Sequence, residues 1–138
     1  MSWQARNTGQ VEQPKIISYR DLLVWRRAMD LVEACYRLTK NLPQSEIYGL
    51  SSQIRRAAVS IPANIAEGHG RRSLGEYTQH LSIANGSLKE LETHLMIAGR
   101  LKYCAENETA PALEACAEIG RMLSGLIQKL RQRKLQER

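Results

Sequence analysis

The sequence predicts an all-α protein, an antiparallel up-and-down bundle of four helices. Three observations lead to this prediction. Residues that favour helices, such as Leu, Ala, Glu and Arg, are abundant, whereas Phe is absent and only four prolines occur in 138 residues. Four long segments carry apolar residues at helical spacing. The connections between them are short, as in bundles whose successive helices run in opposite directions.

The first helix is predicted from Ser18 to about Asn41. Ser18 and Asp21 have the spacing of a capping box, in which each side chain accepts a bond from a free backbone N–H. Pro43 ends the helix. Residues 1–17 are polar and lack periodicity, so they are interpreted as a flexible N-terminal arm. The wide apolar face comprises Leu22, Trp25, Ala28, Met29, Leu31, Val32, Cys35, Tyr36 and Leu38.

The second helix is predicted from residues 45–46 to Gly68, a residue that can close a helix in the left-handed conformation. Pro62 lies inside this segment, where it removes one backbone hydrogen bond and crowds the preceding turn. We therefore expect a kink near Pro62. Alternatively, Ser60 caps a fresh helical start.

The third helix is predicted to begin at the capping box of Ser73 and Glu76 and to reach about Tyr103. Its apolar residues recur in alternating steps of four and three, which is typical of a coiled-coil seam. The seam consists of Tyr77, Leu81, Ala84, Leu88, Leu91, Leu95 and Ala98.

Thr109 followed by Pro111 predicts the start of a fourth helix that ends near Lys134. Its apolar face consists of Leu113, Cys116, Ile119, Leu123, Leu126 and Leu130. The bundle is thus expected to span residues 18–134, and residues 135–138 form the end of a basic tail.

A polar stripe runs along the second helix, opposite its apolar face, and consists of Gln53, Arg56, Ser60, Asn64 and Glu67. Two interpretations stay open: a ligand site, or an internal hydrogen-bonded network that fixes helix register or a subunit contact. The network is favoured, with Glu90 or Glu92 as the carboxylate that receives Arg56. If that carboxylate is buried, Arg56→Ala should destabilise the protein by several kcal/mol.

The third helix also carries Glu76 with His80 and Glu90 with His94, both at a spacing of four residues. The two pairs lie about 21 Å apart along a helix, too far to share one ion. We therefore expect surface side-chain pairs and no metal.

The three cysteines have no spacing typical of a metal site or a disulfide framework. Cys35 and Cys116 occupy apolar helical positions and are expected to be buried free thiols. Cys104 lies near a loop and is expected to be more exposed.

The chemistry-bearing motifs of enzymes are missing from the sequence. It contains no nucleophile elbow, phosphate-binding loop or dinucleotide fingerprint, so neither an enzyme nor a cofactor is expected. No apolar run approaches the length of a membrane span. A cytoplasmic protein is the natural expectation.

The formal charge of +6 is concentrated toward the C-terminus. The tail contains Lys129, Arg131, Arg133 and Lys134, and a further pair, Arg71 and Arg72, precedes the third helix. These six residues are candidates for phosphate contacts with nucleic acid. An equally weighted alternative is that the tail complements a helix dipole and keeps the protein soluble.

Several ordered segments resemble the four-helix-bundle family of 23S rRNA intervening-sequence proteins. They are LLVWRRAMDL at 22–31, the connection from Pro43 to Leu50, the long SQIRRAAVSIPANIAEG, and IANGSLKELETHL at 83–95. The resemblance extends from Tyr19 to about Leu130. It implies a homopentamer and a link to RNA or the ribosome. A related branch of the family assists reverse transcriptases in diversity-generating retroelements.

Two functional hypotheses follow. The first is a non-enzymatic, oligomeric protein that binds RNA or a ribonucleoprotein through basic surfaces. The alternative is an assembly or scaffold protein whose partner is another protein, such as a reverse transcriptase.

Overall fold

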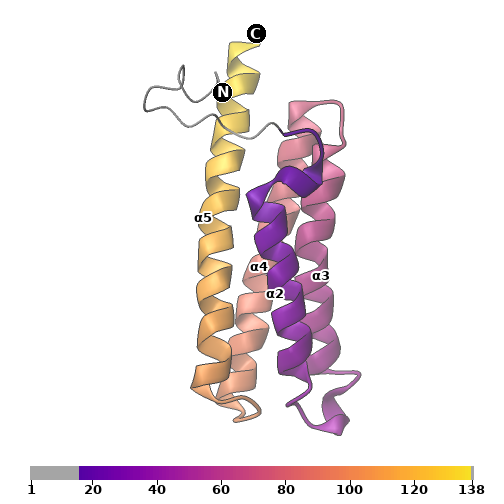
Figure 1. Cartoon of the computed structure of the whole chain (residues 1–138), viewed down its shortest axis with the longest axis vertical. Coiled ribbons are helices and arrows are strands. Elements are labelled where there is room, and N and C mark those ends of the chain that lie inside the picture. The colour runs from indigo at the N-terminus through magenta and orange to yellow at the C-terminus, as the bar shows by residue number, and fades with distance from the viewer. Residues whose placement is uncertain (1–15, 138) are drawn as a thin grey trace, which may run out of the picture.

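The computed structural model describes residues 16–137 and shows a bundle of four α-helices (Figure 1). Successive helices run in opposite directions, and each packs against its two neighbours in the cyclic order α2, α3, α4, α5. The predicted all-α up-and-down fold is confirmed. The elements are η1 (Tyr19–Asp21), α2 (Leu23–Thr39), η2 (Gln44–Glu46), α3 (Leu50–His69), α4 (Leu74–Arg100) and α5 (Glu106–Gln136).

The cap predicted at the first helix exists, but it belongs to the 3-10 turn η1. The Arg20 N–H donates to Ser18 Oγ at 3.2 Å, and the Ser18 N–H donates to Asp21 Oδ2 at 3.0 Å. Leu22 then takes an extended conformation, with ψ of 124°, and α2 begins at Leu23. The predicted start at Ser18 is therefore wrong by five residues. Of the predicted arm, residues 1–17, all but the last two lie outside the described residues.

The start of α3 is set by the side chain of Glu46. Its Oε1 accepts the Leu50 N–H at 3.0 Å, and its Oε2 accepts the hydroxyl of Tyr103 at 2.9 Å. The bond from Leu50, followed by that from Tyr103, lowers the pKa of Glu46. A Cβ on Gly49 would lie 2.5 Å from Glu46 Oε1, so a larger residue there would displace this carboxylate. The predicted start at residues 45–46 is wrong because η2 intervenes.

The helix α3 continues without a break through Pro62, which is buried inside it. A fresh helical start at Ser60 is therefore wrong, and the kink near Pro62 stays a prediction. The side chain of Asn64 donates to the Ser60 carbonyl at 2.9 Å, within one turn of the proline. This bond does not replace the one that Pro62 withdraws, because the carbonyl that the proline leaves without a helical donor is that of Ala58.

The start of α4 matches the prediction, whereas the start of α5 does not. Ser73 Oγ accepts the Glu76 N–H at 3.1 Å, which confirms the cap of α4. The predicted start of the last helix at Thr109 is wrong. The carboxylate of Glu108 accepts the Ala105 N–H at 2.7 Å, so α5 already begins at Glu106. It runs to Gln136, and the predicted tail therefore starts within its last turn.

The core lies along the axis of the bundle and contains most of the predicted apolar faces. The seam of α4 is confirmed, because all of its members from Leu81 to Ala98 are buried. The expectation of an exposed Cys104 is wrong, since that residue is 4% exposed. The largest fully buried side chains are Leu31, Ile54, Ile61, Ile65, Leu81, Leu88, Leu91, Leu95, Ile119, Leu123, Cys35 and Cys116.

Candidate functional site

The polar stripe predicted on α3 divides into two groups. Ser60 and Asn64 are half-buried and bond to side chains of α4. Gln53, Arg56 and Glu67 are exposed. The inner pair therefore connects the helices, and the outer three follow the solvent edge of the same seam.

A continuous series of hydrogen bonds joins the two helices. Ser60 Oγ lies 2.8 Å from Ser87 Oγ on α4. Asn64 Nδ2 donates both to the Ser60 carbonyl and, at 3.1 Å, to Ser60 Oγ. Because both bonds use the amide nitrogen, Asn64 Oδ1 faces His80 Nδ1 at 3.2 Å. This bonding pattern assigns the ring proton of His80 to Nδ1.

The series continues outward through charged side chains. His80 Nδ1 lies 3.7 Å from Glu67 Oε2, and Glu67 Oε1 accepts a bond from Arg71 at 2.8 Å. Arg71 also lies 3.9 Å from the carboxylate of Glu76. These outer ion pairs are about half exposed, so each contributes little to stability. We call the set the α3–α4 network: Ser60, Asn64, Glu67, Arg71, His80 and Ser87.

Gly68 brings the helices together beside this network. A Cβ at that position would lie 2.7 Å from His80 Cβ and 3.1 Å from Tyr77 Cδ1. No side chain fits such a gap without movement of one helix. Gly68 was predicted to close the helix, but it lies inside α3, where its role is close packing.

The predicted pairing of Arg56 with Glu90 or Glu92 is wrong. Arg56 and Glu90 are exposed, and within residues 16–137 neither forms an ion pair. Glu92 instead pairs with Lys89 at 3.2 Å and lines a hollow shared with α5. Helical periodicity placed Arg56 on the correct side of α3, but Glu92 projects from the opposite side of α4.

The two histidines of α4 are not the surface pairs that their spacing suggested. His80 bonds to Asn64 on the neighbouring helix, not to Glu76. His94 Nε2 is buried and has no hydrogen-bond partner among the described residues. No group of three His, Cys, Asp or Glu residues within the described chain has the geometry of a metal site.

The predicted basic residues gather at the end of the bundle where α3 turns into α4. Arg71 and Arg72 lie in that turn, and Lys134 Nζ lies 3.1 Å from the position of a Cβ on Gly75, in the first turn of α4. Burial raises the pKa of Tyr77, and the nearby positive charge of Arg133 opposes this shift. Arg133 and Lys134 of α5 therefore lie over the start of α4. We call this region the basic end.

The sequence did not assign two further arginines to the basic end. Arg20 and Arg26 are exposed and linked by a bond from Arg26 Nε to the Arg20 carbonyl at 2.9 Å. Arg26 also helps lower the pKa of Asp21, after the two backbone hydrogen bonds that this carboxylate accepts. The antiparallel topology, which places the start of α2 beside the end of α3, could have identified them.

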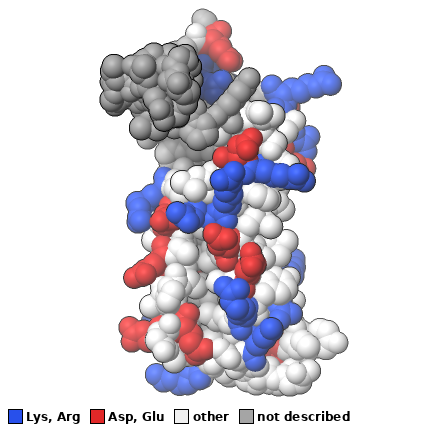
Figure 2. Space-filling model, viewed as in Figure 1, with Lys and Arg blue, Asp and Glu red and all other residues white. Residues whose placement is uncertain are grey.

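Lys129 and Arg131 are also exposed, about one turn and about half a turn before Arg133 on α5. They extend the positive charge down this helix. Figure 2 shows basic side chains along the whole height of the described surface, and acidic side chains over the lower part of α5. Along α5 itself the charge changes from acidic in the first half of the helix to basic toward its end.

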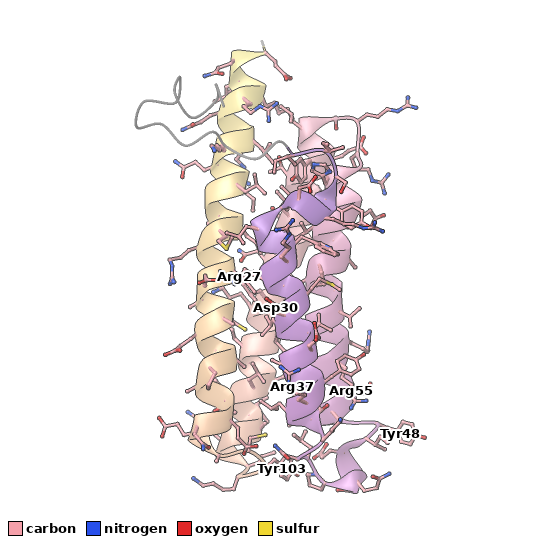
Figure 3. The ribbon with its side chains drawn as sticks, viewed as in Figure 1. Arg27, Asp30, Arg37, Tyr48, Arg55 and Tyr103 are labelled. Carbon is pink, nitrogen blue, oxygen red and sulfur yellow. The ribbon has the colours of Figure 1, made fainter. Side chains whose placement is uncertain are left out.

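A groove of about 730 Å³ separates α2 from α5 on the lower half of the bundle. Arg27, Asp30 and Arg37 form its α2 wall (Figure 3). Arg27 pairs with Glu118 of α5 at 3.2 Å, and Asn41 Nδ2 donates to Glu108. These two contacts bound the groove lengthwise.

The thiols of Cys35 on α2 and Cys116 on α5 lie below the groove, in the core. Burial raises the pKa of each to about 12, and the proximity of Cys35 adds to the shift of Cys116. Because a thiolate is the reactive form, these cysteines are chemically inert at neutral pH. They serve as apolar core residues, as predicted.

None of the helices within residues 16–137 is long and apolar enough to cross a membrane. The chain matches no curated protein. Its fold is similar to the crystal structure of a protein with unknown function from the S23 ribosomal protein family of Bacteroides thetaiotaomicron. The two share 25% sequence identity and a TM-score of 0.72, over 76% of this chain and 98% of the other. The model of the family described as 23S rRNA-intervening sequence protein matches residues 20–125, and the chain therefore belongs to that family.

Proposed function

We propose that this protein is a non-enzymatic, cytoplasmic, oligomeric bundle that binds RNA or a ribonucleoprotein through its basic end. The observation that carries the proposal is the convergence of basic residues from three separate segments. The basic side chains at this end are Arg20, Arg26, Arg71, Arg72, Arg133 and Lys134.

Arg20 lies over the ring of Tyr19 and Arg26 donates to the Arg20 carbonyl, and of the other four side chains three are available for phosphate. Arg71 is held by Glu67 and Glu76, whereas Arg72, Arg133 and Lys134 form no ion pair with any residue of the described chain. Contacts of Lys and Arg with phosphate supply most of the non-specific affinity for nucleic acid. The aromatic rings there, Tyr19 and Tyr77, are both partly buried, so charge and shape would govern recognition more than base stacking.

Self-assembly would strengthen such binding. The family resemblance implies five copies, and five chains at +6 each carry a formal charge of +30. Rings of positive charge raise the local concentration of a polyanion and the rate of its association. Binding would then be cooperative with assembly and steeply dependent on salt.

The alternative is a scaffold whose partner is another protein, such as a reverse transcriptase. Exposed apolar side chains favour it, namely Ile83 and Ile97 on α4 and Leu101 directly after this helix. A scaffold of this kind would bind bulk RNA weakly. It would also tolerate neutralisation of the basic end.

The test is RNA affinity at about 50 and 200 mM salt, measured for the full chain and for the variant Arg72→Ala/Arg133→Ala/Lys134→Ala. Losing three phosphate contacts should weaken binding and lower the slope of log affinity against log salt by about 2–3. The matched control, Arg56→Ala/Arg100→Ala/Arg121→Ala, removes the same charge from exposed, unpaired positions elsewhere on the described surface.

The control variant should keep most of the affinity. Equal losses in the two variants would show that net charge, and not the basic end, governs binding. If the full chain binds no RNA at either salt concentration, the scaffold alternative is favoured.

A further inference from the structure

The loop between α2 and α3 presents an unusually exposed aromatic side chain. Tyr48 is 94% exposed, and the neighbouring Ile47 is 45% exposed. Figure 3 shows Tyr48 projecting away from the bundle at its lower end. Tyrosine is among the residues that most often anchor protein interfaces, because it buries a large area at low entropic cost. We call residues 44–49 the Tyr48 loop.

This loop is rigidly held. The carboxylate of Glu46 bonds at the same time to the Leu50 N–H and to the hydroxyl of Tyr103, at 3.0 and 2.9 Å. Gly49 leaves room for that carboxylate. These contacts tie the loop to the start of α3 and to the segment after α4. The backbone on either side of Tyr48 is therefore fixed before any partner binds, which reduces the entropic cost of binding.

The α2–α5 groove has the properties of a matching receptor. Its floor is apolar, with Ala34, Leu38 and Ala115 among its lining residues. Its charged lining is acidic overall, because Arg27 and Arg37 are outnumbered by the carboxylates of Asp30, Glu108, Glu114 and Glu118. Glu114 is exposed and forms no ion pair with any described residue.

The surroundings of the Tyr48 loop carry the opposite charge. Lys40 and Arg55 line a small cavity together with Ile47. Arg55 stacks on the ring of Tyr36, with its guanidinium carbon 4.6 Å from the ring centre, whereas Lys40 is exposed. The loop also contains the carboxylate of Glu46, which is engaged by the Leu50 N–H and the Tyr103 hydroxyl, so the net charge around the loop is positive and opposite to that of the groove lining.

The positions of the two surfaces require a second copy of the chain. The groove lies on the α5 side of α2, and the loop leads to α3 on the other side, so a loop does not reach the groove of its own chain. Both surfaces lie in the lower half of the bundle. Each copy can therefore give its loop and receive another at the same level, the heterologous arrangement from which closed rings form.

We infer that Tyr48 of one copy inserts into the α2–α5 groove of the next copy, with Lys40 of the first facing Glu114 of the second. This inference rests on the self-assembly included in the proposed function. It assigns the contact surfaces, which the family match does not specify.

The experiment is sedimentation velocity on the full chain and on two variants that each remove one side of the contact. Tyr48→Ser removes the inserted side chain, and Ala34→Trp fills the groove. Each should weaken self-association at least about tenfold, as expected for loss of a central anchor. Ile83→Ser removes an exposed apolar residue from α4, 44% exposed compared with 94% for Tyr48, and should keep the oligomer. Circular dichroism melts verify that every variant folds.

Mixing the two defective variants gives a sharper result. The Tyr48→Ser chain still has an open groove, and the Ala34→Trp chain still has its loop, so a one-to-one pair should form where neither variant associates alone. Likewise, Lys40→Glu should weaken assembly, and adding Glu114→Lys should restore it.

The possible outcomes distinguish the loop-in-groove contact from the self-assembly on which it rests. An oligomeric wild type whose mass is unchanged by Tyr48→Ser or Ala34→Trp would overturn the loop-in-groove contact and leave self-assembly standing. Failure of the mixed variants to pair would overturn it as well. A monomeric wild type would overturn self-assembly itself and assign the groove to a different protein.

Discussion

The α3–α4 and α2–α5 interfaces show two different ways of packing neighbouring helices. At α3–α4, Gly68 allows close approach, and Ser60, Asn64 and His80 bond across the seam. At α2–α5, one ion pair and one amide bond bound a groove of about 730 Å³. The α3–α4 pair has the largest contact in the described bundle, and α2–α5 the smallest of the four helix pairs.

The two interfaces differ in how far side chains are engaged across them. Polar bonds across α3–α4 depend on the relative position of the two helices, so they fix register as well as contributing energy. The shorter contact at α2–α5 leaves side chains on both helices accessible to another molecule. The α3–α4 network thus has the contacts expected of the internal network predicted from the sequence. The α2–α5 groove, which is open, is the better candidate for binding a partner.

The largest expected effect comes from adding a methyl group at the closest point of α3–α4. Gly68→Ala would place a Cβ 2.7 Å from that of His80 and force the helices apart. Overpacking of this kind costs up to about 3 kcal/mol. Denaturant unfolding followed by circular dichroism measures the loss.

Gly86→Ala is the matched control, because a Cβ at Gly86 meets no atom within 4 Å. In an exposed helix interior this change should stabilise the protein by about 0.5–1 kcal/mol. Opposite signs for the two substitutions would support the role assigned to Gly68. Equal gains would show that α3 and α4 adjust freely and that close packing there is unimportant.

The next largest effect concerns the network itself. Asn64→Ala removes the bonds to Ser60 and leaves His80 without its amide partner, so it should cost about 1–2 kcal/mol. Arg56→Ala alters the same stripe at an exposed position and should stay within about 0.5 kcal/mol of the wild type. Thermal melts of both variants test this difference, and a larger loss for Arg56→Ala would reverse the assignment.

The smallest expected effect concerns the buried thiols of Cys35 and Cys116, and it tests whether solvent reaches them from the α2–α5 groove. The folded-state pKa values of Cys35 and Cys116 are raised to about 12 from 9.0, so folding favours the neutral thiols. Their contribution to stability is complete below pH 9 and is lost as pH rises toward 12. At pH 10 the loss should be about 1 kcal/mol for each thiol.

The measurement is the free energy of unfolding between pH 8 and 11 for the wild type, Cys35→Ala and Cys116→Ala. Each substitution removes one titrating thiol and should flatten the decline. Identical slopes in all three proteins would show that solvent reaches the thiols through the groove. Resistance of the folded protein to alkylation at pH 8 gives an independent check.

The sequence was sufficient for the fold and for the cap of α4. Helical periodicity identified the four helices, and Ser73 with Glu76 marked the start of α4 correctly. The errors in the helix boundaries arose where a turn or a nearby side chain that accepts a backbone N–H moved the start of the helix. Ser18 caps a 3-10 turn, and Glu108 begins α5 ahead of Thr109. Such choices depend on a few backbone angles, which residue types alone do not determine.

The candidate site was predicted less completely, for a different reason. Periodicity placed Asn64 and Arg56 on one side of a helix, but both the partner helix and the angle at which it packs decide which of them is buried. His80 was assigned to Glu76 because both lie on one helix, whereas its partner Asn64 is on another. The groove was not predicted, since it arises from the spacing between α2 and α5.

The unequal lengths of the helices have a consequence for how the protein can change over evolution. With 31 residues, α5 is about 46 Å long, whereas α2 has 17 residues and spans about 25 Å. Residues 131–137, at the end of α5, are all exposed, including Leu135. Substitutions there remove no buried side chain, so new binding preferences can arise in this segment without loss of the core. The seam around Gly68, in contrast, would tolerate very few alternatives.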